Sequence, residues 1–177
     1  LQGEAFVANQ AYQAELHFRE DKGKIDLTAH YDPTQEAYQV ALQVDSLEPV
    51  HFMPLDSLYS LTASVKMEGK GTDPFAQHTK AKIEGAVNDI RYGLTSVSDV
   101  RLTGALENHA LKVDLISGYP LAKFDLSLNG ELKPKAVKAM LIADVMNLDL
   151  YEMHVMSDPF STSFQLFAEA ESDLGDR

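Results

Sequence analysis

Alternation of apolar and polar residues with a period of two dominates this sequence. Between residues 12 and 19, Tyr12, Ala14, Leu16 and Phe18 alternate with polar or charged residues. Successive side chains of a β-strand point to opposite faces of its sheet, so this pattern predicts a strand with one apolar face. The pattern recurs at 24–31 and 38–45. The sequence therefore predicts an all-β chain of amphipathic strands.

The turns between these strands set the expected registers. Residues paired across antiparallel strands share a face of the sheet, so apolar residues must pair with apolar residues. A tight turn at Lys22-Gly23 would set Phe18 opposite Leu27 and Leu16 opposite Ala29. A looser turn at 32–35 would set Leu27 opposite Leu42. Both registers keep the apolar faces together, which predicts one meander of three strands.

A second meander is expected between residues 102 and 126. A turn at 107–110 would set Leu102 opposite Leu115, and a turn around 118–120 would then set Leu115 opposite Phe124 and Val113 opposite Leu126. These pairs are again apolar on both sides. The second half of the chain therefore follows the same construction as the first.

Asn129-Gly130 is a common signal for a two-residue hairpin. A turn at this dipeptide would place Leu128 opposite Glu131 on the apolar face. A strand that continues through Gly130 keeps Leu128 and Leu132 in phase instead. Gly130 is therefore interpreted as a strand glycine that marks a bulge or bend.

Two further strands are expected between the meanders. One carries apolar residues at alternate positions from Leu61 to Met67, the other from Ala81 to Val87, and the Gly-rich stretch 68–74 reads as the turn between them. Residues 49–60 contain two prolines and do not alternate, which indicates a short helix or loop that caps a sheet end. The segment 134–141 is compatible with either a helix or a strand.

The chain also repeats itself at a distance of 101 positions. An ungapped shift that takes Val44 to Val145 also takes Tyr59 to Phe160, Val65 to Leu166 and Glu68 to Glu169. The matched feature is a strand, a short apolar crossover and a second strand. A repeat of this kind predicts stacked units that share one buried face, with sub-repeats at about 1–100 and 101–177. We expect the chain to be one piece of a longer repeat.

Composition limits the classes of function. The formal net charge of −12 and the pI near 4.8 disfavour nucleic acid and anionic membrane surfaces, because both bind clustered Lys and Arg. The chain has no cysteine, which excludes disulfides, thiolate zinc sites and a cysteine nucleophile. This absence fits a reducing compartment and a cysteine-poor bacterial envelope equally well. No apolar run approaches the roughly 20 residues of a membrane-spanning helix.

Catalytic and metal-binding motifs are not recognised. The sequence contains no nucleophile elbow, phosphate-binding loop, zinc-protease motif or EF-hand pattern. The six histidines are scattered, and His17 and His30 are interpreted as a solvated pair on the outer face of the first hairpin. The many carboxylates at outward strand positions indicate a hydrated face. We therefore expect no enzymatic activity, no cofactor and no metal site.

Two interpretations of the apolar face remain open. It is either the core of a sandwich or closed barrel, or a groove that holds acyl chains. The groove is favoured by aliphatic residues and Phe without any Trp, and by the lack of other strands or a long amphipathic helix to cover the face. Five methionines are also expected to cluster in the crossovers, where a flexible thioether adapts to varied contacts: Met53, Met140, Met146, Met153 and Met156.

Residues 44–74 combine a strand end, an apolar crossover broken by proline, an amphipathic strand at 58–65 and a Gly-rich turn that ends in Asp73-Pro74. This combination resembles the repeating unit of the TamB and AsmA-like envelope proteins, and the region from Phe160 to Leu174 is similar. The resemblance implies an antiparallel amphipathic sheet curled into an open groove of the β-taco kind, with one or two short helical crossovers. It also implies a protein anchored in the inner membrane that crosses the periplasm of a Gram-negative bacterium.

Members of this family are associated with the movement of phospholipid to the outer membrane and, with the partner TamA, with assembly of outer-membrane proteins. The resemblance implies no catalytic residues. Contact with a TamA- or BamA-like protein is expected to lie outside this chain. The other expected partners are phospholipid acyl chains and adjacent repeats of the same protein.

The resulting hypothesis is a non-enzymatic periplasmic segment whose apolar groove carries phospholipid acyl chains between the two membranes. The groove lining is expected to include ten residues: Leu16, Phe18, Leu27, Leu42, Val65, Ile83, Leu102, Val113, Phe124 and Leu126. The alternative is a structural or chaperone-like module that binds client strands by pairing them with a sheet edge.

Overall fold

A computed structural model of the chain describes residues 2–8, 11–51 and 58–173. Every strand in it belongs to one antiparallel sheet of twelve strands, and neighbouring strands follow one another in chain order except that short β7 pairs with β6 alone. The strands are β1 (Gln2–Ala8), β2 (Ala11–Glu20), β3 (Gly23–Asp32), β4 (Ala37–Leu47), β5 (Leu58–Lys70), β6 (Lys80–Tyr92), β7 (Thr95–Val97), β8 (Val100–Glu107), β9 (Ala110–Ser117), β10 (Ala122–Lys133), β11 (Ala136–Asp149) and β12 (Ser161–Asp173).

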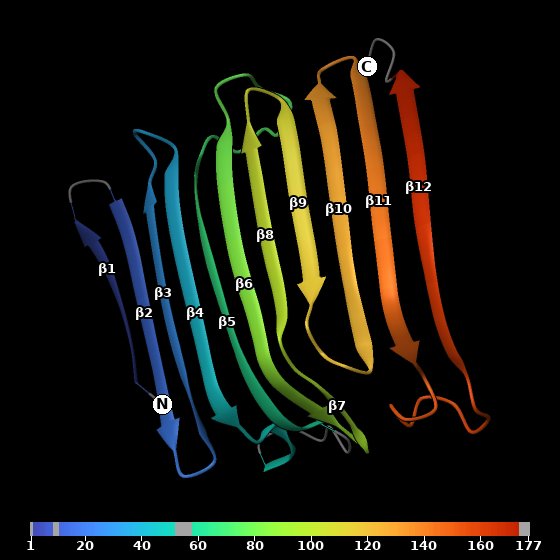
Figure 1. Cartoon of the computed structure of the whole chain (residues 1–177). Helices are drawn as coiled ribbons and strands as arrows, with labels where there is room; N and C mark the ends of the chain where they lie inside the picture. The colour runs from blue at the N-terminus through green and yellow to red at the C-terminus, as the bar shows by residue number, and fades with distance from the viewer. Residues whose placement is uncertain (1, 9–10, 52–57, 174–177) are drawn as a thin grey trace.

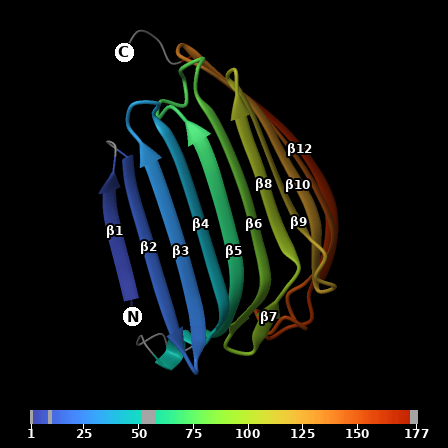
Figure 2. The same cartoon turned by 90° about the vertical axis from the view of Figure 1, so that its left-hand side faces the viewer.

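The sheet is curled and open (Figures 1 and 2). In Figure 2, β1 to β5 lie across the front, whereas β9 to β12 crowd together at one side because the sheet turns away from the viewer. In the described part of the chain, β1 and β12 pair on one side only, so the sheet does not close on itself. The expected fold class, an all-β antiparallel sheet with an open curl, is confirmed.

The described part of the crossovers holds one short helix, the 3₁₀ helix η1 (Pro49–His51). The expected cap at 49–60 consists of η1 and the first residues of β5, with 52–57 outside the described residues. The segment that was ambiguous between helix and strand is a turn at Pro134-Lys135 followed by β11. The Gly-rich turn begins later than expected, because β5 continues to Lys70 and the loop runs from Gly71 to Thr79.

Two of the predicted registers are correct. β3 and β4 pair Leu27 with Leu42, and β8 and β9 pair Leu102 with Leu115. β10 also continues through Gly130, which confirms that Asn129-Gly130 is not a turn. Gly130 pairs regularly with Leu111 and Ala139, and the register shift of β10 lies at Lys123/Phe124, so of the expected bulge or bend the bulge is wrong.

The other two predicted registers are wrong by two residues. β2 and β3 pair Phe18 with Ile25 and Leu16 with Leu27, around a two-residue turn at Asp21-Lys22. Gly23 adopts a φ of 130°, which only glycine tolerates well, and this fixes the turn one residue earlier than expected. A shift by two residues keeps every side chain on its face. The rule that paired residues share a face of the sheet, here called parity, therefore does not exclude the wrong register.

The same error occurs between β9 and β10. Phe124 pairs with Ser117 rather than with Leu115, and Leu126 pairs with Leu115 rather than with Val113. The loop between the strands is held by main-chain hydrogen bonds from Gly118 N to Asp99 O and from Ala122 N to Tyr119 O. These contacts shorten the loop and bring the two strands into the observed register.

The shift of 101 positions also describes the structure. β4 and β5 pair Leu42 with Val65 and, beyond a bulge, Leu47 with Leu61. β11 and β12 pair Ala143 with Leu166 and, beyond a bulge, Leu148 with Thr162. Each residue of the second set lies 101 positions after its counterpart in the first. The two strand pairs therefore share both register and bulge.

The turn at Gly23 gives a first prediction, on stability. A Cβ on residue 23 would overlap the Leu47 main chain at a φ that L-residues avoid, so Gly23→Ala should destabilise the fold by about 2 kcal/mol. Gly85→Ala is the control, because its Cβ would lie 3.6 Å from its nearest neighbours. Urea unfolding monitored by circular dichroism should show a loss for Gly23→Ala only. Equal midpoints for the two variants would contradict the role of Gly23.

Candidate functional site

One face of the sheet carries an unbroken central row of apolar residues from β2 to β12. Each of the ten strands on this path contributes one residue, and each residue pairs with the next. The central row is Leu16, Leu27, Leu42, Val65, Gly85, Leu102, Leu115, Leu126, Ala143 and Leu166. Every position is aliphatic or glycine.

Three parallel rows flank the central row on the same face. One runs from Phe18 through Val44, Val87 and Phe124 to Phe164, and a second runs from Ala14 through Val40, Ile83, Val113 and Leu141 to Ala168. A third begins at Tyr12, Tyr31 and Tyr38 and ends at Ala170. Together the four rows are called the apolar face.

The ten residues that the sequence singled out all lie on this face. Leu16, Leu27, Leu42, Val65, Leu102 and Leu126 belong to the central row, Phe18 and Phe124 to the row on one side, and Ile83 and Val113 to the row on the other. The sequence-based list omitted Ile25, Val44, Leu115, Leu128 and Leu166, which lie on the same face. The parity that identified the ten would have found these residues too.

The apolar face is large. Four rows two residues apart cover about 20 Å along the strands, and ten strands cover about 43 Å across them, given the usual rise and spacing of β-strands. The face thus covers about 860 Å² in the plane of the sheet, whereas the largest apolar patch of a soluble monomer is typically about 300–600 Å². In the described part of the chain, no second sheet or helix covers it. It therefore requires another molecule or segment to exclude water.

Curvature gives the two faces different exposure. In β6 and β8, apolar-face residues such as Ile83 and Leu102 are half-buried, whereas polar-face neighbours such as Glu84 and Thr103 are exposed. Side chains converge on the inner side of a curled sheet and spread apart on the outer side. Over β6 and β8 the exposure pattern thus fits an apolar face on the inner side of the curl.

One crossover closes part of the lower end of the sheet. The loop between β11 and β12 reaches β7, where Thr95 Oγ1 donates a hydrogen bond to the Met153 carbonyl at 2.5 Å (Figure 1). Met153 is buried, while Val155 and Met156 of the same loop are exposed. The expected grouping of methionines in crossovers is correct for Met153 and Met156.

The other methionines of that group do not follow the expectation. Met140 and Met146 lie within β11 rather than in a crossover, because this strand extends to Asp149. Met140 pairs with Asn129 on the polar face, and Met146 lies in the bulge of β11 and is exposed. Met53 lies outside the described residues.

The opposite face of the sheet, called the polar face, is covered by ion pairs and hydrogen bonds between strands. Asp26 Oδ1 lies 2.5 Å from His17 Nδ1 and 3.4 Å from Arg19 Nη2, and the His17 hydrogen bond is the main cause that lowers the pKa of Asp26. Asp114 accepts a hydrogen bond from Ser127 Oγ at 2.8 Å and pairs with Lys112 at 3.1 Å, and both contacts lower its pKa.

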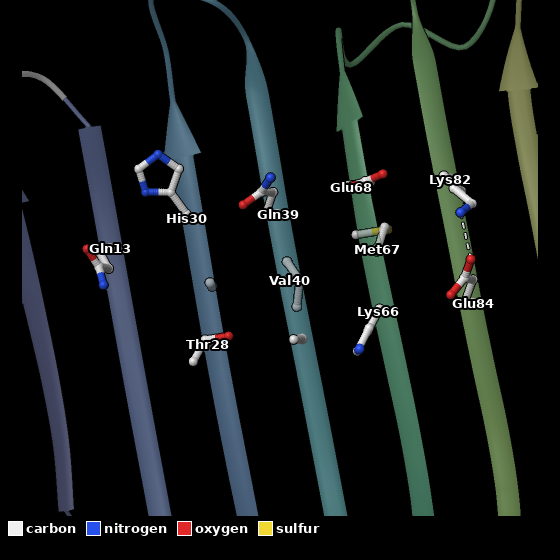
Figure 3. A pocket seen from close by; sticks show the side chains of 12 residues that line it. Gln13, Thr28, His30, Gln39, Val40, Lys66, Met67, Glu68, Lys82 and Glu84 are labelled. Carbon is white, nitrogen blue, oxygen red and sulfur yellow. Dashed lines mark ion pairs between the residues drawn. The ribbon is translucent and has the colours of Figure 1, made fainter.

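A shallow hollow of about 610 Å³ lies on the polar face over β2 to β6. The residues that line it include Thr28, which has a small side chain, and Gln13, Lys66 and Glu84, which have longer ones (Figure 3). The cations and carboxylates in the hollow neutralise each other, as in the Lys82–Glu84 pair at 2.6 Å. Most of the residues that line the hollow lie on the polar face, and Ala29, Val40 and Met67 from a row of the apolar face also border it.

Other classes of site find little support in the described part of the chain. It contains no group of three or more His, Asp or Glu side chains placed to hold a metal ion. His17 pairs across the strands with Asp26, and His30 lies between Gln13 and Gln39. None of the helical segments there has the length and apolar composition of a membrane span.

Comparison with known proteins gives no significant match to this chain among protein-family models, curated proteins or solved structures.

The environment of Asp114 gives a second prediction, on pH dependence. A carboxyl pKa below its unfolded value of 3.8 stabilises the fold above that pH, and this contribution is lost as the pH falls through the folded pKa. Asp114→Asn should therefore lower the melting temperature at pH 7 and approach the wild type near pH 2. Asp125→Asn removes the same charge from the polar face of the adjacent strand and serves as the matched control. A constant offset for Asp114→Asn at all pH values would contradict this role.

Proposed function

We propose that this chain is a non-enzymatic segment of a TamB/AsmA-like periplasmic protein, and that its apolar face carries phospholipid acyl chains between the inner and outer membranes. The observation that carries the proposal is the central row, which runs without a polar residue across ten strands and has no covering layer in the described part of the chain. The division into sub-repeats at about 1–100 and 101–177 is part of this proposal.

Acyl chains suit this surface physically. Each buried methylene contributes about 0.8 kcal/mol, so a chain laid along the face gains affinity in proportion to the length that it buries. The lining offers few polar groups, and the Ser117 side chain is buried with its Oγ 3.3 Å from Tyr119 N. A site of this kind has no directional chemistry and accepts acyl chains of differing length and saturation.

The continuity of the face favours movement of the lipid rather than storage. An enclosed cavity would hold an acyl chain at one place, whereas equivalent residues on successive strands offer a series of similar positions. A lipid that passes from Leu27 to Leu102 exchanges one set of aliphatic contacts for another of comparable strength. Such a surface has low barriers between neighbouring positions.

The sandwich-core interpretation is less well supported. A sheet that forms half of a sandwich packs about 10 Å from a second sheet, and that sheet also needs an apolar inner face. In the described residues all the strands belong to the same sheet. The apolar face would need a second layer from elsewhere, whereas the lipid proposal explains its exposure directly.

Two variants on adjacent residues of β9 test this function. Leu115 lies in the centre of the apolar face, and Ile116 points to the polar face, where it is exposed. Leu115→Glu should reduce co-purifying phospholipid by about tenfold or more, because a carboxylate in hydrocarbon costs several kcal/mol. Ile116→Glu makes a closely similar change on the other face and should leave lipid binding unchanged.

Native mass spectrometry of gently purified protein measures the bound phospholipid, and far-UV circular dichroism verifies that both variants fold. Equal lipid content in the two variants, or a wild-type protein without any lipid, would overturn the proposal. If Leu115→Glu does not fold, the milder variant Leu115→Thr tests the same position. It should lose part of the bound phospholipid, between the wild type and the loss expected for Leu115→Glu.

A further inference from the structure

We propose that three tyrosines at one end of β2–β4 hold the polar head of a bound phospholipid, and that its acyl chain runs from there along the strands toward their other end. The tyrosines, Tyr12, Tyr31 and Tyr38, lie at the upper end of these strands, where β3 ends and β4 begins (Figure 1). The inference rests on the proposed function and adds an orientation of the lipid to it.

The three tyrosines form a continuous row on neighbouring strands of the apolar face. Tyr12 pairs with Tyr31 and Tyr31 with Tyr38, and the first two rings stack with their centroids 6.4 Å apart. Tyr38 pairs with Gly69, and a Cβ on Gly69 would overlap the hydroxyl end of Tyr38, so this ring lies across β5. The rest of the row, from β6 to β12, has no hydroxyl: Ala81, Leu106, Leu111, Gly130, Ala139 and Ala170. The phenol hydroxyls of this row are therefore gathered over β2–β5.

The opposite, lower end of the same strands is apolar. Three rows from the tyrosines, the apolar face carries Phe18, Ile25 and Val44, whose side chains have no polar atom. Val44 is only 6% exposed, whereas Tyr12 at the upper end is 55% exposed. The two ends of β2–β4 thus differ both in chemistry and in access to water.

The crossover after β4 encloses part of the lower end. Glu48 N donates a hydrogen bond to Lys22 O at 2.8 Å, which holds the start of this crossover against the turn between β2 and β3. Pro49, the next residue, is buried. A charged lipid head therefore reaches water more readily at the tyrosine end.

A phospholipid matches both ends of this surface. The hydrocarbon core of a bilayer is about 30 Å thick, so the chains of one leaflet extend over about 15 Å, and the four rows cover about 20 Å. Tyrosine places its ring in hydrocarbon and its hydroxyl at the polar boundary. Phenol hydroxyls can donate hydrogen bonds to phosphate and ester oxygens. The reverse orientation would place the charged head against Phe18 and Val44, which offer it no hydrogen bond.

Two spin-labelled phospholipids locate the ends of the bound molecule. One carries a nitroxide on its head group, and the other carries it at the end of an acyl chain. In NMR spectra of the intact chain, the head label should reduce the ring signals of Tyr12, Tyr31 and Tyr38 more than the methyl signals of Ile25 and Val44. The chain-end label should produce the opposite loss of signal.

Removal of the hydroxyls tests their role in binding. The triple variant Tyr12→Phe, Tyr31→Phe and Tyr38→Phe keeps the rings, and it should bind the head-labelled phospholipid about fivefold more weakly or worse, the effect of losing one hydrogen bond. Tyr92→Phe is the matched control, because Tyr92 is exposed at the lower end of β6 and should not affect binding.

The outcomes separate this inference from the proposed function. A reversed pattern of signal loss, or equal loss at both ends with both labels, would overturn the orientation and leave lipid binding in place. Unchanged affinity in the triple variant would overturn the role of the hydroxyls. Spectra unaffected by either lipid would overturn both the orientation and the proposed function.

Discussion

The structure depends on one constraint: cross-strand pairing keeps the residues of each face of the sheet together, and every pair of the central row joins aliphatic residues or glycine. Each strand alternates with period two, so any register shifted by one residue would mix the two faces. The bulges preserve this phase. In β4 and β11 the pairing resumes beyond the bulge with Leu47 opposite Leu61 and Leu148 opposite Thr162. The result is a continuous apolar face rather than a set of separate patches.

Those features of the fold that follow from the alternation of side chains between the two faces could be predicted from the sequence. Parity identified the amphipathic strands, the face of each predicted lining residue and the absence of a turn at Asn129-Gly130. It could not choose between registers that differ by two residues, because both keep the faces matched. That choice depended on local geometry, such as the φ of Gly23 and the hydrogen bonds of the loop after β9.

Elements that form only by contact with their neighbours could not be predicted from the sequence pattern either. β7 has three residues, too few for a period to be recognised, and it forms by pairing with the end of β6. β1 lies against β2, which orders its backbone. The contact between Thr95 and Met153 joins segments 58 positions apart and has no sequence pattern of its own. The size of the candidate site likewise emerged only once the ten strands were assembled.

A curled sheet with an apolar inner face needs a ligand that excludes water without specific hydrogen bonds, and acyl chains meet that need. The repeat of the β4–β5 pair in β11–β12 continues this face as far as the last described strand.

The most direct test of the account is to locate the hydrocarbon. Intermolecular nuclear Overhauser effects between methyl groups of the protein and acyl-chain protons of bound phospholipid measure this contact residue by residue. The account predicts contacts from leucines of the central row on well-separated strands, including Leu27, Leu102 and Leu126, and none from Ile116 or Ile142 on the polar face. Contacts confined to the polar face, or a central row whose methyl groups contact only protein, would contradict it.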